Sequence, residues 1–129
     1  MHKLIAIVLI TLALPACRKQ AETQFVPLPT SVHLRTMHHD IPVAAVNVFI
    51  KYNAAEFPGY DKAAAYFDTV LVSDINGKVE LHPVQQGHHW AVAFGSSEHG
   101  IPLPIYGSMP LFIDADKHPG VDTSIYMFE

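Results

Sequence analysis

Apolar and polar residues alternate along much of the chain after Ile41, and this period of two is typical of half-buried β-strands. The clearest alternation covers residues 46–52. One face of this expected strand carries apolar and aromatic side chains, namely Val46, Val48, Ile50 and Tyr52. The opposite face carries Asn47, Phe49 and Lys51. The pattern predicts that the first set packs on a hydrophobic core.

Two further apolar runs, residues 70–72 and 79–81, flank the dipeptide Asn76-Gly77. Asn-Gly favours the positive φ angles of a type I′ turn, so we expect a β-hairpin here. More strands are expected at residues 88–94, 109–114 and 121–128, where apolar runs end at turn-forming residues. In the first of these, Trp90, Val92 and Phe94 should face the core. Six or seven short strands at this spacing predict an all-β fold, a single antiparallel β-sandwich.

The segment between the strands at 46–52 and 70–72 follows a different pattern. Pro58-Gly59 indicates a turn, because proline cannot continue a strand ladder. Asp61 precedes three alanines and could cap a turn or two of helix. The segment could equally be an insertion loop without helix.

Residues 1–16 have the composition of a signal peptide. Lys3 contributes positive charge, and an apolar stretch from Leu4 to Leu14 follows, interrupted only by Thr11. Eleven residues are too few to cross a bilayer as a permanent helix, so we expect this segment to be removed.

The apolar stretch ends in the sequence LPAC, which finishes at Cys17, the only cysteine of the chain. This sequence resembles the lipobox of bacterial lipoproteins. The resemblance implies that Cys17 is diacylated, becomes the mature N-terminus and anchors the protein in a membrane. Arg18 stands where the inner-membrane retention signal of this pathway usually has aspartate, so we expect an outer-membrane lipoprotein that faces the periplasm or the cell surface.

Residues 17–40 alternate only briefly and contain Pro27 and Pro29, which favour extended, unpaired backbone. We interpret this segment as a tether between the lipidated cysteine and a β-sandwich domain at residues 41–129. Alternatively, residues 31–40 form a first edge strand with Val32, Leu34 and Thr36 on one face.

The order of motifs in the second half resembles the transthyretin-like β-sandwiches also known as carboxypeptidase regulatory-like domains. The matching segments are VNVFIKYNA, SDINGKVEL, PVQQG, HHWAVAF and the closing GSMPLFID and IYMFE. The resemblance covers roughly residues 41–129, and the chain departs from the family at His88-His89-Trp90 and at the alanine-rich insert of residues 62–65. It implies a non-catalytic domain that serves as a structural spacer, an adhesin module or an accessory that contacts carbohydrate or protein.

The charge of the chain argues against nucleic-acid binding. The formal net charge is −4, and it becomes −5 without residues 1–16 because only Lys3 is lost. No basic patch with interleaved aromatic residues is present. The chain also lacks the G-x-S-x-G, phosphate-loop and H-E-x-x-H motifs, so we expect no enzyme activity. The one hydrolase alternative places Ser96 or Ser97 next to His99 in the sequence GSSEHG.

Histidine is unusually abundant, with nine residues in the chain and eight after residue 16. Imidazole is a preferred ligand of zinc and copper. Adjacent residues of a strand point to opposite faces, so His88 and His89 cannot both bind one ion. If His89 points outward, it could meet His82 and Glu80 from a neighbouring strand. The second hypothesis is therefore a lipoprotein that binds zinc or copper through His82, His89 and Glu80. The pair His38-His39 is a further histidine-rich position.

Overall fold

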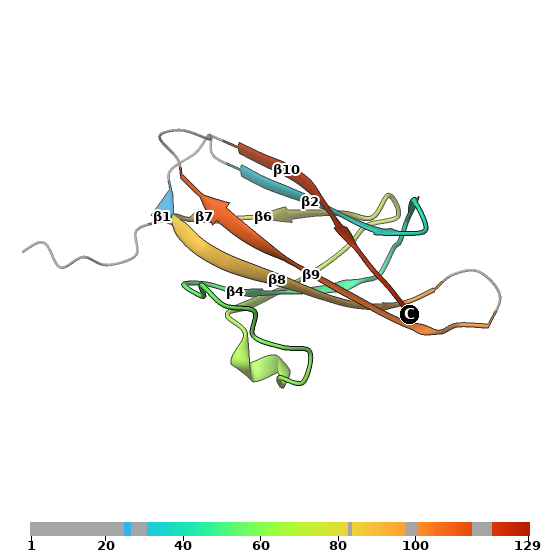
Figure 1. The fold of residues 1–129 in the computed structure, drawn as a ribbon. Coiled ribbons are helices and arrows are strands. Elements are labelled where there is room, and N and C mark those ends of the chain that lie inside the picture. The colour runs from blue at the N-terminus through green and yellow to red at the C-terminus, as the bar shows by residue number, and fades with distance from the viewer. Residues whose placement is uncertain (1–24, 27–30, 83, 98–100, 115–119) are drawn as a thin grey trace, which may run out of the picture.

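The computed structural model describes residues 25–26, 31–82, 84–97, 101–114 and 120–129, which form two stacked β-sheets (Figure 1). In the first sheet, β2 (Ser31–His38) lies between β10 (Gly120–Tyr126) and β6 (Lys78–Leu81), and β3 (Ile41–Pro42) pairs with the end of β2. The second sheet has the order β5 (Thr69–Val72), β4 (Asn47–Lys51), β8 (Gly87–Ser96) and β9 (Pro104–Ile113). The all-β sandwich that the sequence predicts is confirmed.

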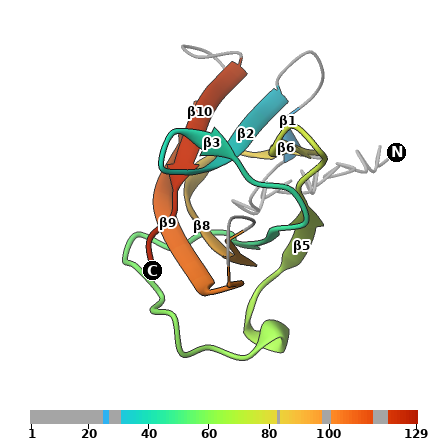
Figure 2. The ribbon, with the colours of Figure 1, turned by 90° about the vertical axis from the view of Figure 1, so that its right-hand side faces the viewer.

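Two smaller elements complete the described chain. A two-stranded sheet joins β1 (Phe25–Val26) to β7 (Val84–Gln85). A single 3₁₀ turn, η1 (Ala64–Tyr66), lies in the segment between β4 and β5, on the side of the second sheet that faces away from the first sheet (Figures 1 and 2). The helix cap expected at Asp61 is wrong, because η1 begins after Ala63 and has no side-chain cap.

The core fills the space between the sheets. Its buried side chains come from alternate positions of the strands, as the period of two requires. The members that are fully buried include Val32, Leu34, Val46, Val48, Ile50, Leu81, Ala91, Ala93, Ile105 and Ile125. The alternation predicted for residues 46–52 is confirmed, since Val46, Val48 and Ile50 are buried and Tyr52 packs against the cluster.

The tether predicted for residues 17–40 is wrong over residues 31–40. Here β2 runs parallel to β10 from Ser31↔Gly120 to Met37↔Tyr126, and antiparallel to β6 on its other side. Val32, Leu34 and Thr36 are buried, as the alternative interpretation of this segment expected. However, β2 is a central strand and not an edge strand. Among the strand pairs that the structure describes, the pairing with β10 is parallel and the others are antiparallel.

The hairpin predicted around Asn76-Gly77 is wrong, although both strands exist. β5 belongs to the second sheet and β6 to the first, so the chain crosses between the sheets here. Gly77 has a positive φ of 72° but Asn76 does not, which excludes a type I′ turn. The turn is organised by Asp74, whose Oδ1 accepts hydrogen bonds from the backbone N–H groups of Asn76 and Lys78 at 2.8 and 2.9 Å.

Replacing Gly77 with alanine is expected to destabilise the protein by about 2 kcal/mol, because a left-handed conformation costs a residue with a Cβ about 1–2 kcal/mol. The new Cβ would also lie 2.7 Å from the backbone oxygen of Thr36. Urea unfolding followed by circular dichroism measures the change. As a control, alanine at the neighbouring Asn76, which has no positive φ, should cost less than Gly77→Ala; an equal loss would contradict the backbone explanation.

Candidate functional site

The face of β8 that was expected to point outward faces the core, and the face that was expected in the core points outward. His89, Ala91 and Ala93 point into the core, and Ala91 and Ala93 belong to the core cluster. Trp90, Val92 and Phe94 lie on the outer face of the second sheet, where Val92 is nevertheless fully buried and Trp90 and Phe94 are half-buried. The prediction that Trp90, Val92 and Phe94 face the core is therefore wrong. The error has a physical cause, because the segment between β4 and β5 covers this outer face and makes both faces of the sheet apolar.

His89 is a buried structural residue with a relative exposure of 1 %. Its Nδ1 accepts a hydrogen bond from the backbone N–H of Asn53 at 3.0 Å, and its Nε2 donates to the carbonyl of Gln85 at 2.8 Å. These two bonds fix the neutral Nε2–H tautomer. Burial lowers the pKa of His89 below its ordinary value, and the nearby His88 lowers it further. Neither ring nitrogen is free to bind a metal ion.

The metal site proposed from His82, His89 and Glu80 does not assemble. Glu80 on β6 and His82, which directly follows β6, are exposed and in contact, with 2.7 Å between Oε1 and Nε2. His89 belongs to β8 in the other sheet, and β6 and β8 are not hydrogen-bonded neighbours. The expectation that His89 points outward toward His82 is wrong because the two faces of β8 were exchanged, as they were for Trp90.

An aromatic cluster covers the outer face of the second sheet. Its rings come from β4, β8, β9 and the segment between β4 and β5: Phe49, Phe57, Tyr60, Tyr66, Phe67, Trp90, Phe94 and Tyr106. Tyr60 is central, with ring centroids 4.8 Å from Tyr106, 4.9 Å from Phe57 and 6.0 Å from Phe94. Most of these contacts are edge-to-face or tilted, the geometry that the ring quadrupole favours.

Polar contacts hold the covering segment, residues 53–68, onto the sheet. Asp68 Oδ2 accepts a hydrogen bond from the backbone N–H of Tyr52 at 2.7 Å. Lys51 Nζ donates to the carbonyl of Tyr66 at 3.1 Å and lies 4.7 Å from the centroid of its ring. The hydroxyls of Tyr60 and Ser108 are 2.9 Å apart. The segment is thus attached at its C-terminal end and near its middle.

The aromatic cluster is only partly covered, and apolar side chains continue beyond it. Val70 and Val72 on the edge strand β5 and Phe112 on β9 share this outer face and are 49 %, 61 % and 53 % exposed. Together with the exposed rings they form what we term the outer-face patch: Phe57, Tyr60, Tyr66, Val70, Val72, Tyr106 and Phe112. Several exposed apolar side chains gathered on one face of a sheet are typical of an interaction site.

Replacing residues 55–66 with a short glycine-serine linker is expected to expose Trp90, the only tryptophan of the chain. Trp90 packs on Phe57 at 5.3 Å, and this contact would be lost. Its fluorescence emission should shift to longer wavelength and become more accessible to acrylamide, while cooperative unfolding persists because the core lies on the other side of the sheet. Unchanged emission would mean that Trp90 is buried independently of this segment.

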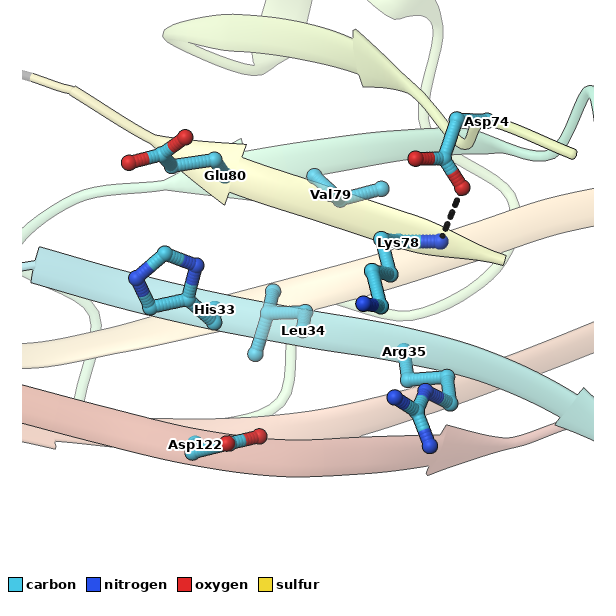
Figure 3. A pocket seen from close by; sticks show the side chains of 8 residues that line it. All are labelled: His33, Leu34, Arg35, Asp74, Lys78, Val79, Glu80 and Asp122. Atoms are coloured by element: carbon cyan, nitrogen blue, oxygen red, sulfur yellow. Dashed lines mark hydrogen bonds between the residues drawn. The ribbon is translucent and has the colours of Figure 1, made fainter. Parts of the chain in front are cut away.

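The opposite, outward face of the first sheet is charged and slightly hollow (Figure 3). Arg35 on β2 lies directly across from Lys78 on β6, a like-charge pair that costs stability. Asp74 lies close to both cations. The hydrogen bond from the backbone N–H of Lys78 lowers the pKa of Asp74 most, and the positive charges of Lys78 and Arg35 lower it further. His33, Glu80 and Asp122 also line this hollow, which has a volume of about 280 Å³. Because its lining carries both positive and negative charges, the hollow favours no single class of ligand.

A second histidine cluster lies at the far end of β2. His38 and His39 have ring centroids 4.1 Å apart, and His38 Nε2 is 3.7 Å from Glu129 Oε1. One ligand atom from each of the three residues lies within 4.8 Å of the others. In the described part of the chain, this is the only group of three or more such side chains that could hold a metal ion. The sequence signal was the pair His38-His39, but nothing in the sequence indicated Glu129.

The hydrolase alternative gains no support from the described residues. The Oγ of Ser97 is buried and accepts a hydrogen bond from the backbone N–H of Leu103 at 3.0 Å, which closes the β8–β9 connection. Ser96 ends β8 and is exposed. His99 and Cys17 lie outside the described residues.

Comparisons with known proteins give no assignment: no protein-family model matches the chain, and no curated protein matches it significantly. Within the described ranges, no helix has the length and apolarity that crossing a bilayer would require.

Proposed function

We propose that this protein is a lipid-anchored β-sandwich of the bacterial cell envelope that acts as a non-catalytic binding module for another envelope protein. Two features support the proposal. The sequence LPAC, ending at Cys17, supplies the anchor. The outer-face patch supplies the contact surface, and it is the observation that carries the binding role.

The composition of the outer-face patch favours a protein partner over a carbohydrate. Tyrosine and tryptophan are enriched at the centres of protein interfaces, and they also stack on sugar rings. Aliphatic side chains serve only the first purpose well, because their burial needs an apolar partner. Val70 and Val72 extend the patch along the edge strand β5, where a partner could also pair with free backbone groups.

The anchor is tested by the variant Cys17→Ser. We expect the wild-type chain to incorporate radiolabelled palmitate and to fractionate with membranes, and we expect the variant to do neither. Globomycin should cause the precursor to accumulate. A Cys17→Ser chain that is still processed and still found in the membrane fraction would contradict lipid anchoring.

The binding role is tested by the double variant Val72→Ser/Phe112→Ser. Both side chains are more than half exposed, so the fold should survive while apolar contact area is lost. After chemical cross-linking in cells, we expect the yield of a specific cross-linked partner to fall at least about tenfold, the effect of losing roughly 1.4 kcal/mol of binding free energy. Ile75→Ser removes an apolar side chain that is 86 % exposed outside the patch, and it is the matched control. Equal yields from the two variants would contradict the proposed surface.

A further inference from the structure

We propose that His38, His39 and Glu129 form a binding site for a divalent transition-metal ion such as zinc. Two imidazoles and one carboxylate are the donor set that zinc uses in sites that keep a position open for water or another ligand. The same set disfavours calcium and magnesium, which take oxygen ligands almost exclusively. This site is separate from the outer-face patch and does not depend on the proposed partner.

The turn between β2 and β3 brings the two imidazoles together. His38 pairs with Ile41, so only His39 and Asp40 connect the strands. Both residues have positive φ angles, 49° and 59°, as a type I′ turn requires. Adjacent side chains on a regular strand would point apart, but the left-handed backbone at His39 rotates its ring toward His38, to a centroid distance of 4.1 Å.

Backbone pairing places the third ligand. The backbone N–H of Met127 donates to the carbonyl of Met37 at 2.8 Å, next to His38 in the chain. Phe128 exchanges two backbone hydrogen bonds with Tyr106 of β9, at 2.8 and 2.9 Å. These bonds fix the backbone up to the residue before Glu129, so the Glu129 side chain begins beside the two rings. All three residues line one hollow, which Asp40 also lines.

The distances fit a site that closes modestly when an ion binds. Two ligands of a tetrahedral zinc ion with bonds of about 2.0–2.1 Å lie roughly 3.3 Å apart. The Nε2 of His38 and Oε1 of Glu129 are already 3.7 Å apart, which is too long for a hydrogen bond but close to this separation. His39 and Glu129 are exposed, so rotation of their side chains can close the remaining gap within the 4.8 Å group.

The sequence of the turn indicates that His39 has a role beyond folding. Type I′ turns prefer Asn-Gly, because a residue with a bulky side chain is strained at positive φ. Here His-Asp occupies the turn instead. Strained backbone of this kind is often found at binding sites, where it presents a side chain in a required direction.

The experiment uses the full chain in detergent with Cys17→Ser as background, so that no free thiol competes for metal. Co²⁺ is titrated while its visible absorption is recorded, and Zn²⁺ is then added as a competitor. We expect one Co²⁺ per chain with the absorption of a low-coordinate site, displaced by Zn²⁺ with an affinity on the order of micromolar. His39→Ala and Glu129→Gln should each weaken binding at least about tenfold. Changing residues that only hydrogen-bond to the ligands of a metal already lowers metal affinity about 10–100-fold.

Two further variants separate a metal site from adventitious histidine binding. His82→Ala removes another exposed histidine that contacts a glutamate, and it should leave binding unchanged. His39→Asn/Asp40→Gly gives the turn its preferred residues, so it should raise the thermal midpoint of the apo protein while weakening metal binding. Absence of binding at millimolar Co²⁺, or binding that survives in His39→Ala and Glu129→Gln, would overturn the proposal. Loss of binding in His82→Ala would also overturn it.

Discussion

Replacing His89 with leucine is expected to destabilise the protein by about 2–4 kcal/mol, although leucine is similar in volume and more hydrophobic. The loss comes from two backbone groups, the N–H of Asn53 and the carbonyl of Gln85, which would lose their hydrogen-bond partner in a buried position. Each unsatisfied buried group costs about 1–3 kcal/mol. Chemical denaturation monitored by circular dichroism measures the change in the free energy of unfolding.

His88→Leu is the matched control for this substitution. His88 is exposed and packs against Phe112 in a tilted arrangement, with ring centroids 4.6 Å apart. We expect the free energy of unfolding of this variant to remain within about 0.5 kcal/mol of the wild-type value, as for most surface changes. If His88→Leu were as destabilising as His89→Leu, the assignment of His89 to the buried face would be wrong.

The same residue makes the stability depend on pH. Because burial lowers the pKa of His89 in the folded protein, the unfolded chain binds a proton more readily than the folded chain. Its contribution to stability is therefore fully present above the ordinary value of 6.5 and is lost as the pH falls toward the folded-state pKa. We expect the free energy of unfolding of the wild type to fall more steeply between pH 7 and pH 5 than that of His89→Leu. Parallel slopes would contradict the lowered pKa.

Replacing Gly107 with alanine is expected to destabilise the protein by about 3 kcal/mol or more, the upper range for inserting a methyl group into a packed site. Gly107 lies on β9 where the end of β10 crosses close to it. A Cβ at this position would overlap the carbonyl oxygen of Tyr126 and would lie 3.1 Å from its carbon and 3.2 Å from Met127 Cα. All three are backbone atoms, which cannot rotate away. Thermal unfolding followed by circular dichroism measures the effect.

The control for this variant is Gly95→Ala on the neighbouring strand β8. A Cβ there would lie 2.9 Å from a terminal methyl group of Val46, so a side chain and not the backbone must yield. We expect a clearly smaller loss of thermal stability than for Gly107→Ala. Because β9 and β10 belong to different sheets, Gly107→Ala should also weaken the junction that holds Phe128 and Glu129 in place.

The positions of most of the longer strands could be predicted from the sequence, although β9 begins at Pro104 and not at residue 109, but the partners of the strands could not be predicted. Alternation identified the buried side chains of residues 46–52, and short apolar runs identified the strands at 70–72 and 79–81. The pairing of β2 with β10 joins segments about 90 positions apart, and no local pattern encodes such a contact. For the same reason the Asn76-Gly77 dipeptide gave the right turn position and the wrong connection, since a turn sequence does not show which sheet each strand joins.

The candidate site was misplaced because both faces of β8 are apolar. Trp90, Val92 and Phe94 are larger than Ala91 and Ala93, so the larger set was expected inside. The segment at residues 53–68 reverses this relation by covering the outer face with aromatic rings. As a result His89 is a core residue. At the end of β2, Glu129 comes close to His38 and His39 only because the backbone of residues 127–128 pairs with neighbouring strands.

The central claim is that the outer face of the second sheet, and not the charged face of the first, contacts a partner protein. A photo-cross-linking amino acid placed at Phe112 or at His33 tests this claim most directly, because both positions are exposed and lie on opposite outer faces. After irradiation of living cells, we predict a discrete, protease-sensitive cross-linked product from position 112 and none from position 33. A product from position 33 alone, equal products from both positions, or a protease-resistant product that glycan-degrading enzymes remove would contradict the account.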